Sequence, residues 1–151
     1  MDKLWDDPDR DFRQRYQVPE HFLWDKYDLA MIDYEGYVTV AIDLLPRSKC
    51  HVLDVGCGDG WVARETIARG HTVVGIDYSD RAIGFAKLMV PEGDFLVGDI
   101  RVLHEYSKLA GAFDAALCIE VVEHVPPDYL PKVLQSIFHC HKPDGCLVIT
   151  V

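Results

Sequence analysis

The strongest constraint on the fold is a regular alternation, after residue 47, of short apolar runs with amphipathic segments. Parallel strands that are covered on both faces read as continuous apolar runs, and helices connect one such strand to the next. The alternation therefore predicts a mostly parallel sheet between two layers of helices. The apolar runs are Cys50–Val55, Thr72–Ile76, Asp94–Val97, Phe113–Ile119 and Cys146–Val151. The helices expected between them are Gly60–Arg69, Ser79–Met89 and Pro127–Cys140.

The segment before the sheet has a different pattern. The first eighteen residues are polar and acidic without a steady period, which indicates a loose arm or lid. From Pro19 to Leu45 apolar residues recur at intervals of three and four, which predicts two helices, broken near Gly36 and ended before Pro46. We expect one structural domain, with an arm and helices at 1–46 and the sheet-containing core at 47–151.

Composition limits the class of partner. A formal charge of -10 and a pI near 5.0 disfavour a nucleic-acid partner and leave a small molecule or a protein as substrate. The five cysteines include no Cys-x-x-Cys pair and are expected to be reduced, mostly buried thiols. No apolar run has the roughly 20 residues of a membrane span, and the N-terminus lacks a signal-peptide pattern. The expected location is the cytoplasm.

A glycine-rich turn, Leu53–Gly60, connects the first strand directly to a helix. Glycines there allow close approach of a ligand to the backbone, although a tight connection without a ligand is the alternative. Asp77 follows the second strand, where nucleotide-binding folds place an acid that accepts hydrogen bonds from ribose hydroxyls. A dinucleotide fingerprint would need a third glycine at Trp61, so NAD or FAD is the second choice.

The arrangement Asp54-x-Gly56-x-Gly58-x-Gly60 resembles motif I of class I S-adenosylmethionine (SAM) dependent methyltransferases. The resemblance continues in order through the chain, from Val52 to its end. The other similar segments are Gly75–Ser79, Phe95–Ile100, Phe113–Glu120 and Lys142–Cys146. Asp144 stands where the family has glycine, a departure of little consequence because aspartate tolerates turn conformations.

The resemblance implies SAM as cofactor and S-adenosylhomocysteine (SAH) as product. Asp77 would hold the ribose, Tyr78 would lie against the adenine, and Asp99 and the backbone of Ile100 would bind the adenine ring. Tyr16 and Tyr27 are added as aromatic residues able to cover the cofactor or the acceptor. The complete set of expected cofactor-binding residues is Asp54, Gly56, Cys57, Gly58, Gly60, Asp77, Tyr78, Asp99, Ile100, Ile119, Glu120, Tyr16 and Tyr27.

Glu120-x-x-Glu123-His124 follows the fourth strand and is the best candidate for added chemistry. Glu123 and His124 could remove a proton from an acceptor hydroxyl, or the three side chains could hold a divalent metal. The segment resembles one in small-molecule O-methyltransferases of quinone biosynthesis, and also one in metal-dependent RNA 3'-terminal 2'-O-methyltransferases. A role restricted to ending the strand and capping the next helix is the remaining alternative.

The predicted architecture is a three-layer α/β sandwich with strand order 3-2-1-4-5, preceded by helices and without the last two strands of the family plan. Strand five would then present an exposed edge that could mediate association. The predicted activity is methyl transfer from SAM to an oxygen, nitrogen or carbon of a small molecule. The rival hypotheses are a metal-dependent RNA 2'-O-methyltransferase and a non-catalytic SAM-binding fragment.

Overall fold

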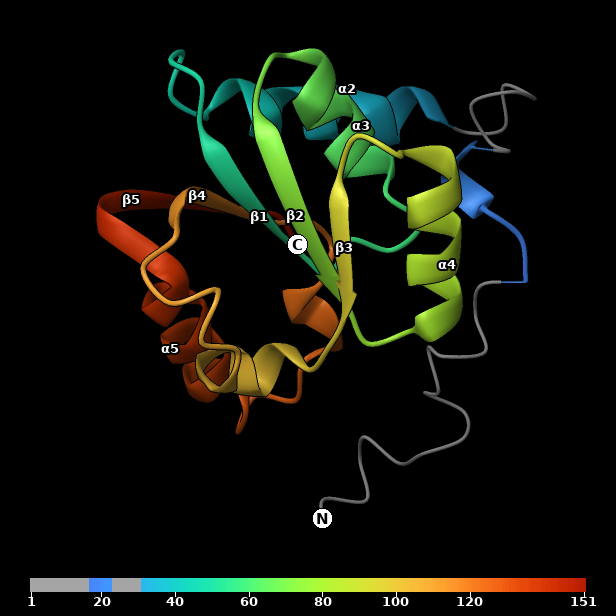
Figure 1. The fold of residues 1–151 in the computed structure, drawn as a ribbon. Helices are drawn as coiled ribbons and strands as arrows, with labels where there is room; N and C mark the ends of the chain where they lie inside the picture. Colours follow the sequence, from blue (N-terminus) through green and yellow to red (C-terminus); the bar gives the residue numbers. More distant parts are fainter. Residues whose placement is uncertain (1–16, 23–30) are drawn as a thin grey trace.

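The computed structural model describes residues 17–22 and 31–151 (Figure 1). The predicted sheet is confirmed: its strands are parallel and their order is β3-β2-β1-β4-β5. The strands are β1 (His51–Val55), β2 (Thr72–Asp77), β3 (Asp94–Val97), β4 (Phe113–Cys118) and β5 (His141–Ile149). The helices are α2 (Met31–Asp43), α3 (Trp61–Ala68), α4 (Asp80–Met89) and α5 (Leu130–Cys140), with 3-10 helices η3 (Ile100–Glu105) and η4 (Val122–His124).

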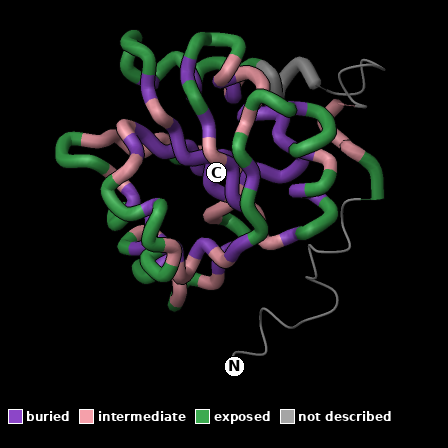
Figure 2. The backbone as a smooth tube through the Cα atoms, viewed as in Figure 1, coloured by how far each residue is buried: buried purple, intermediate pink, exposed green. Residues whose placement is uncertain are grey.

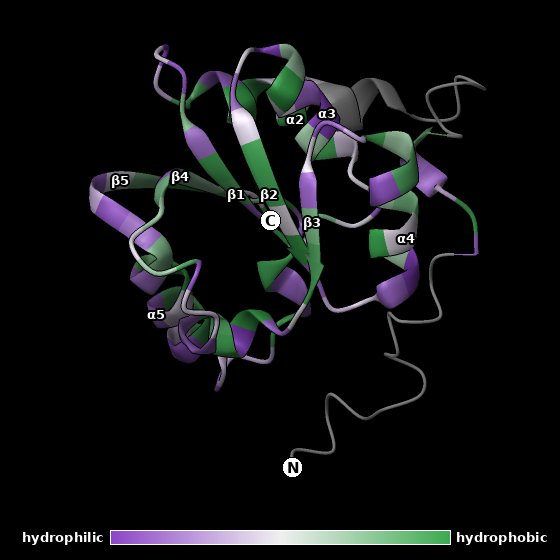
Figure 3. Cartoon of the chain, in the orientation of Figure 1, coloured by the Kyte–Doolittle hydropathy of each residue, from purple (hydrophilic) through white to green (hydrophobic). Residues whose placement is uncertain are grey.

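The sheet lies between two helical layers, as the alternation predicts. Side chains of a strand point to opposite faces in turn, so Val52 packs with α2, α3 and α4 whereas Leu53 and Val55 pack with η3 and α5. The central strands β1 and β4 are accordingly buried along most of their length, whereas the edge strands β3 and β5 are mostly exposed or half-buried (Figure 2). Hydrophobic residues predominate along β2 (Figure 3). None of the helices in the described part of the chain is long and apolar enough to cross a membrane.

The predicted break at Gly36 is wrong, because α2 runs through that residue without interruption. A glycine inside a helix costs about 1 kcal/mol relative to alanine. Burial of Val38, Ala41 and Ile42 against the sheet offsets that cost in this helix. The helix ends before Pro46, as expected. The other predicted N-terminal helix falls partly on 23–30, outside the described residues.

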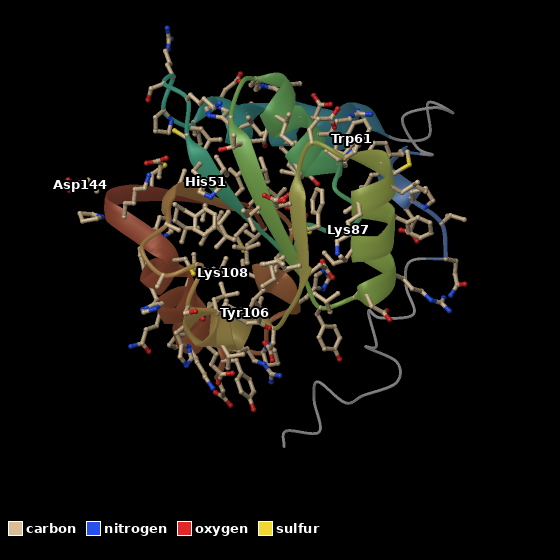
Figure 4. The ribbon with its side chains drawn as sticks, in the orientation of Figure 1. His51, Trp61, Lys87, Tyr106, Lys108 and Asp144 are labelled. Atoms are coloured by element: carbon tan, nitrogen blue, oxygen red, sulfur yellow. The ribbon has the colours of Figure 1, made fainter. Side chains whose placement is uncertain are left out.

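The strand β5 begins earlier than predicted and contains an irregularity. Phe113 pairs with His141, whereas Ala115 pairs with Cys146, so the intervening turn bulges from the sheet. Asp144 lies in this turn with a φ of 65°, a left-handed conformation that aspartate tolerates better than most residues. It is labelled at the outer end of the turn in Figure 4. Lys142 donates to the Asp114 carboxylate at 2.8 Å and ties the bulge to β4.

Ser79 caps α4 as predicted, because its hydroxyl accepts from the Ala82 N–H at 3.2 Å. The α3 helix follows Gly60, which adopts a φ of 89° and has no side chain to cap with. This conformation allows the polypeptide to pass from β1 to α3 within the few residues of the glycine-rich turn. This places the start of α3 next to the carboxyl end of the sheet.

A glycine substitution tests the packing between β2 and β3. A Cβ at Gly75 would lie 2.6 Å from Cδ1 of the buried Phe95 and 2.8 Å from Sγ of Cys57. We expect Gly75→Ala to lower the free energy of unfolding by about 1–3 kcal/mol through overpacking. Gly84→Ala, in an open position of α4, is the matched control and should raise it by up to about 1 kcal/mol. Urea unfolding followed by circular dichroism measures both, and an unchanged Gly75→Ala would contradict the packing.

Candidate active site

The carboxyl ends of β1 and β4 form the point at which the strand order reverses. The connection after β1 leads to α3 on one face of the sheet, and the connection after β4 leads to α5 on the other. In open parallel sheets, ligands bind in the crevice that this divergence creates. A pocket of about 400 Å³ lies there, within the size range of small-molecule sites. Its lining residues are His21, Tyr37, Asp54, Gly56, Cys57, Gly58, Asp59, Trp61, Val62, Ile119, Glu120, Glu123 and His124.

The glycine-rich turn forms one wall of the pocket. Gly56, Gly58 and Gly60 all have a positive φ. A Cβ at Gly56 would lie only 2.5 Å from Cγ2 of Val121, so the turn and the loop after β4 are in close contact. The N–H groups of Gly56 and Cys57 donate to the Ile76 carbonyl at 2.8 and 3.1 Å, which anchors the turn to β2.

Asp77 stabilises the same turn from the end of β2. Its carboxylate accepts from the N–H of Gly58 at 2.9 Å and from the N–H of Ser79 at 2.8 Å. Burial raises the pKa of Asp77, and these backbone hydrogen bonds partly oppose that rise. The lining of the pocket does not include Asp77 or the neighbouring Tyr78.

Asp54 is a buried carboxylic acid at the pocket whose hydrogen bonding is incomplete. It is buried at the end of β1, and its Oδ2 atom has no hydrogen-bond partner. Burial, and then the charge of Asp77, raise the pKa of Asp54 to about 7. A buried carboxylate without a partner is costly, so a cationic or hydrogen-bond-donating ligand beside it would stabilise the protein.

The opposite wall consists of the loop after β4 together with α2. Glu120 has a φ of 54°, and the Thr150 hydroxyl accepts from its N–H at 3.0 Å while donating to its Oε1 at 2.9 Å. Burial raises the pKa of Tyr37 to about 12, with added contributions from the charges of Glu120 and Glu123. The Tyr37 hydroxyl therefore stays protonated at neutral pH.

Glu123 and His124 lie in η4 and both line the pocket. The distance between His124 Nε2 and Glu123 Oε1 is 3.9 Å, too long for a hydrogen bond, and the two side chains are 44% and 32% exposed. Within residues 17–22 and 31–151, no three His, Cys, Asp or Glu side chains are grouped so that they could hold a metal ion. The geometry thus gives no support to the metal site that the RNA-methyltransferase hypothesis needs.

Asp99 and Ile100 lie outside this pocket lining. Asp99 caps η3, and its carboxylate accepts from the backbone N–H and the guanidinium of Arg101 at 2.8–2.9 Å. Burial alone would raise the pKa of Asp99, but the hydrogen bonds from Arg101 outweigh it and lower the pKa. Ile100 begins η3 and is buried. Tyr16 and Tyr27 lie outside the described residues.

Sequence reasoning missed His21, Tyr37, Asp59, Trp61 and Val62 as pocket residues. Asp59, Trp61 and Val62 could have been inferred, because they belong to or directly follow the glycine-rich turn. Trp61 is labelled at the start of α3 in Figure 4. His21 and Tyr37 carry no local motif, and only the packing of the N-terminal segment brings them to the sheet.

The charge of the pocket lining restricts its ligands. The described lining residues include four carboxylic acids, Asp54, Asp59, Glu120 and Glu123, and two imidazoles, but neither lysine nor arginine. Anionic groups would be repelled from such a surface, whereas cationic groups and hydrogen-bond donors would be attracted. The pocket therefore suits a ligand with positive charge.

A parallel sheet of order 3-2-1-4-5, with a glycine-rich turn and a pocket at its switch point, is the arrangement of a Rossmann-like nucleotide-binding domain. A family profile described as a methyltransferase domain matches residues 26–151, and the chain belongs to this family.

The chain is 34% identical over 144 residues to a ubiquinone biosynthesis O-methyltransferase of Dechloromonas aromatica, covering 93% of this chain and 54% of that protein. It is 40% identical over 132 residues to the ubiquinone biosynthesis O-methyltransferase of Chromobacterium violaceum, and the match covers 83% of this chain and 55% of that protein. A TehB-like SAM-dependent methyltransferase from Corynebacterium glutamicum has a similar structure, with a TM-score of 0.69 and 27% sequence identity. The match covers 87% of this chain and 71% of that protein. The chain thus spans about half the length of these ubiquinone-pathway relatives.

Proposed function

We propose that this protein binds SAM in the pocket at the ends of β1 and β4 and transfers its methyl group to a small molecule, leaving SAH. The buried Oδ2 of Asp54, which lacks a partner, is the observation that carries the proposal. SAM carries a sulfonium and an ammonium group, so it fits a pocket with four carboxylic acids. The family membership and the SAM-dependent structural neighbour support the same cofactor.

The residues proposed to hold the cofactor are those expected from the motifs. Asp54 would offset its positive charge, and the turn residues Gly56, Cys57, Gly58 and Gly60 would lie against it. Ile119 and Glu120 line the pocket from β4. Asp77, Tyr78, Asp99 and Ile100 would bind its ribose and adenine. Tyr16 and Tyr27 belong to the proposal as covering residues.

When bound, SAM supplies a methyl group on a positively charged sulfur, which is already activated for displacement. The protein has to hold an acceptor atom in line behind that methyl group and exclude water. Tyr37, which lines the pocket and stays protonated because its pKa is about 12, would contact the acceptor with a neutral hydroxyl. Glu123 and His124, which line the pocket and are partly exposed, would contact the acceptor directly.

The proposed acceptor is a small molecule with a ring hydroxyl. The relatives named as ubiquinone biosynthesis O-methyltransferases support an oxygen acceptor on a quinone precursor. The acidic lining supports a neutral acceptor over an anionic one, because like charges repel in a partly buried site.

Methyl transfer from radiolabelled SAM to 4-methylcatechol tests the proposal. We expect label in the organic product in proportion to enzyme, and SAH in equal amount. Parallel reactions with EDTA and with Mg²⁺ show whether a metal is required, and the heat-denatured protein is the control. If the protein transferred label to none of the compounds in a panel of phenols, catechols and amines, that result would contradict the proposed function.

Two further parts of the proposal concern location and assembly. The five cysteines are free thiols and four are buried, in keeping with a reducing compartment such as the cytoplasm. The outer edge of β5 pairs with no strand of the described chain, and Ile149 is exposed there. We propose that this edge mediates association, and a concentration-independent monomer in sedimentation velocity would refute it.

A further inference from the structure

We propose that His21 is the general base of the reaction and that Asp59 is the residue that positions it. This proposal rests on the proposed methyl transfer to a hydroxyl group. It concerns residues that carry no motif of their own and were not among the expected catalytic residues. Both residues line the pocket, together with Asp54 and Tyr37.

Asp59 and His21 form a double contact between segments far apart in the chain. The backbone N–H of His21 donates to Oδ2 of Asp59 at 2.9 Å, and the His21 ring nitrogen Nδ1 lies 2.8 Å from Oδ1. The Asp59 side chain is 1% exposed and that of His21 is 15% exposed. A carboxylate buried to this degree requires such partners, so the contact fixes both side chains.

The contact also determines which ring nitrogen carries the proton. A carboxylate can only accept, so a neutral His21 ring must place its hydrogen on Nδ1 to bond with Asp59. Its Nε2 then carries the lone pair and is the basic atom. A buried acid that sets the tautomer of a histidine in this way is the arrangement that prepares imidazole as a general base.

The N-terminal segment that carries His21 is held against α3. The ring of Phe22 packs edge-on against Trp61, with centroids 5.5 Å apart. The guanidinium of Arg64 lies 3.6 Å from the Trp61 ring centroid and 5.0 Å from that of Phe22. These contacts fix the residue next to His21 at the start of α3, beside the glycine-rich turn.

The other histidine of the pocket, His124, is more exposed than His21. His124 Nε2 lies 3.9 Å from Glu123 Oε1, and both side chains are partly exposed. At that distance the Glu123 carboxylate does not form a hydrogen bond with the His124 ring. Of the two imidazoles, His21 therefore has the geometry of a base, and His124 keeps the role of contacting the acceptor.

The acceptor O–H bond breaks and its proton passes to Nε2 of His21, giving an imidazolium next to the Asp59 carboxylate. The oxygen electron pair forms the new C–O bond as the S–C bond breaks, and that electron pair stays on sulfur. The products are the methyl ether and neutral SAH, and His21 returns its proton to water.

Three variants separate proton transfer from positioning. His21→Asn keeps an amide N–H in place of Nδ1–H and so retains the contact with Asp59, but it has no basic nitrogen. We expect kcat with 4-methylcatechol to fall by about 10²–10⁴-fold while the SAH affinity, from calorimetry, stays within threefold. Added imidazole should restore part of the kcat of His21→Ala, and Asp59→Asn should lower kcat through loss of the correct tautomer. His139→Asn, exposed on α5, is the matched control and should behave as the native protein.

The results have distinct meanings. A native-like kcat for His21→Asn overturns the proposal, as does an equal loss of kcat and SAH affinity, which would indicate a purely structural contact. A hydrogen on Nε2 of neutral His21, detected by ¹⁵N NMR of the histidine rings, overturns it independently of turnover. Absence of transfer by the native protein would instead refute the proposed function, and the base assignment would fall with it.

Discussion

Replacing Asp54 by asparagine is expected to weaken cofactor affinity strongly and, at the same time, to stabilise the ligand-free protein. Losing one partner of a buried charge pair costs about 2–5 kcal/mol, so the Kd for SAM should rise by roughly 30-fold or more. Burial raises the pKa of Asp54 to about 7 without ligand, which means that its charged form destabilises the fold. The asparagine carries no charge at any pH and is free of that destabilisation.

The stability gained by Asp54→Asn is expected to depend on pH. An aspartate with a raised folded pKa favours folding only while it is protonated, so this contribution is present below its ordinary value of 3.8 and is lost as the pH rises through about 7. Asp54→Asn should therefore differ little from the native protein near pH 4. It should be more stable by on the order of 2–4 kcal/mol at pH 8.

Urea unfolding at several pH values measures the stability difference, and calorimetry measures the affinity. Asp94→Asn, at the exposed start of β3, is the matched control and should change neither. Native-like SAM affinity in Asp54→Asn would contradict the role given to Asp54. A stability gain without a pH dependence would show that its charge is not the cause.

Gly56→Ala should have the second large effect, because it damages the turn and the loop opposite it together. The φ of 73° disfavours any side chain, and the new Cβ would lie 2.5 Å from Cγ2 of Val121. We expect a loss of about 2–4 kcal/mol in the free energy of unfolding and at least tenfold weaker SAH binding. Chemical unfolding and fluorescence titration provide the two values.

A second substitution separates the steric contact with Val121 from the backbone strain at residue 56. Val121→Ala removes the atoms that the new Cβ would meet, while the backbone strain at Gly56 remains. The double variant should recover part of the stability lost by Gly56→Ala, which would be seen as a favourable coupling of about 1 kcal/mol. Strict additivity of the two substitutions would contradict the contact between the turn and the loop after β4.

The sheet could be predicted from the sequence because its signals are local. Each strand contains an apolar run, and β3 was predicted to the residue. Gly36 misled the prediction, since an intrinsic cost of about 1 kcal/mol is small beside the burial of Val38 and Ile42. The bulge in β5 was missed because the polar run at 142–145 reads as a turn before the strand, whereas the chain already pairs with β4 at His141.

Pocket residues at the ends of strands could be predicted from the sequence, whereas those that come from the N-terminal segment could not. Asp54 and the glycines lie at a strand end, and that position alone brings them to the switch point. His21 reaches the pocket through its contacts with Asp59, 38 residues away, and through the packing of Phe22 on Trp61. Such a contact depends on how the N-terminal segment packs on α3, which periodicity and motif spacing do not encode.

Calorimetric titration of the protein with SAM, SAH and NAD tests the central claim most directly. The unpartnered carboxylate of Asp54 and the acidic pocket predict one site per chain for both adenosyl ligands. Tighter binding of SAM at pH 8 than at pH 6 is also predicted, because its positive charge favours ionised Asp54. NAD, with two phosphates facing this acidic lining, should not bind. Binding of NAD in place of SAM and SAH would contradict the assignment of the pocket.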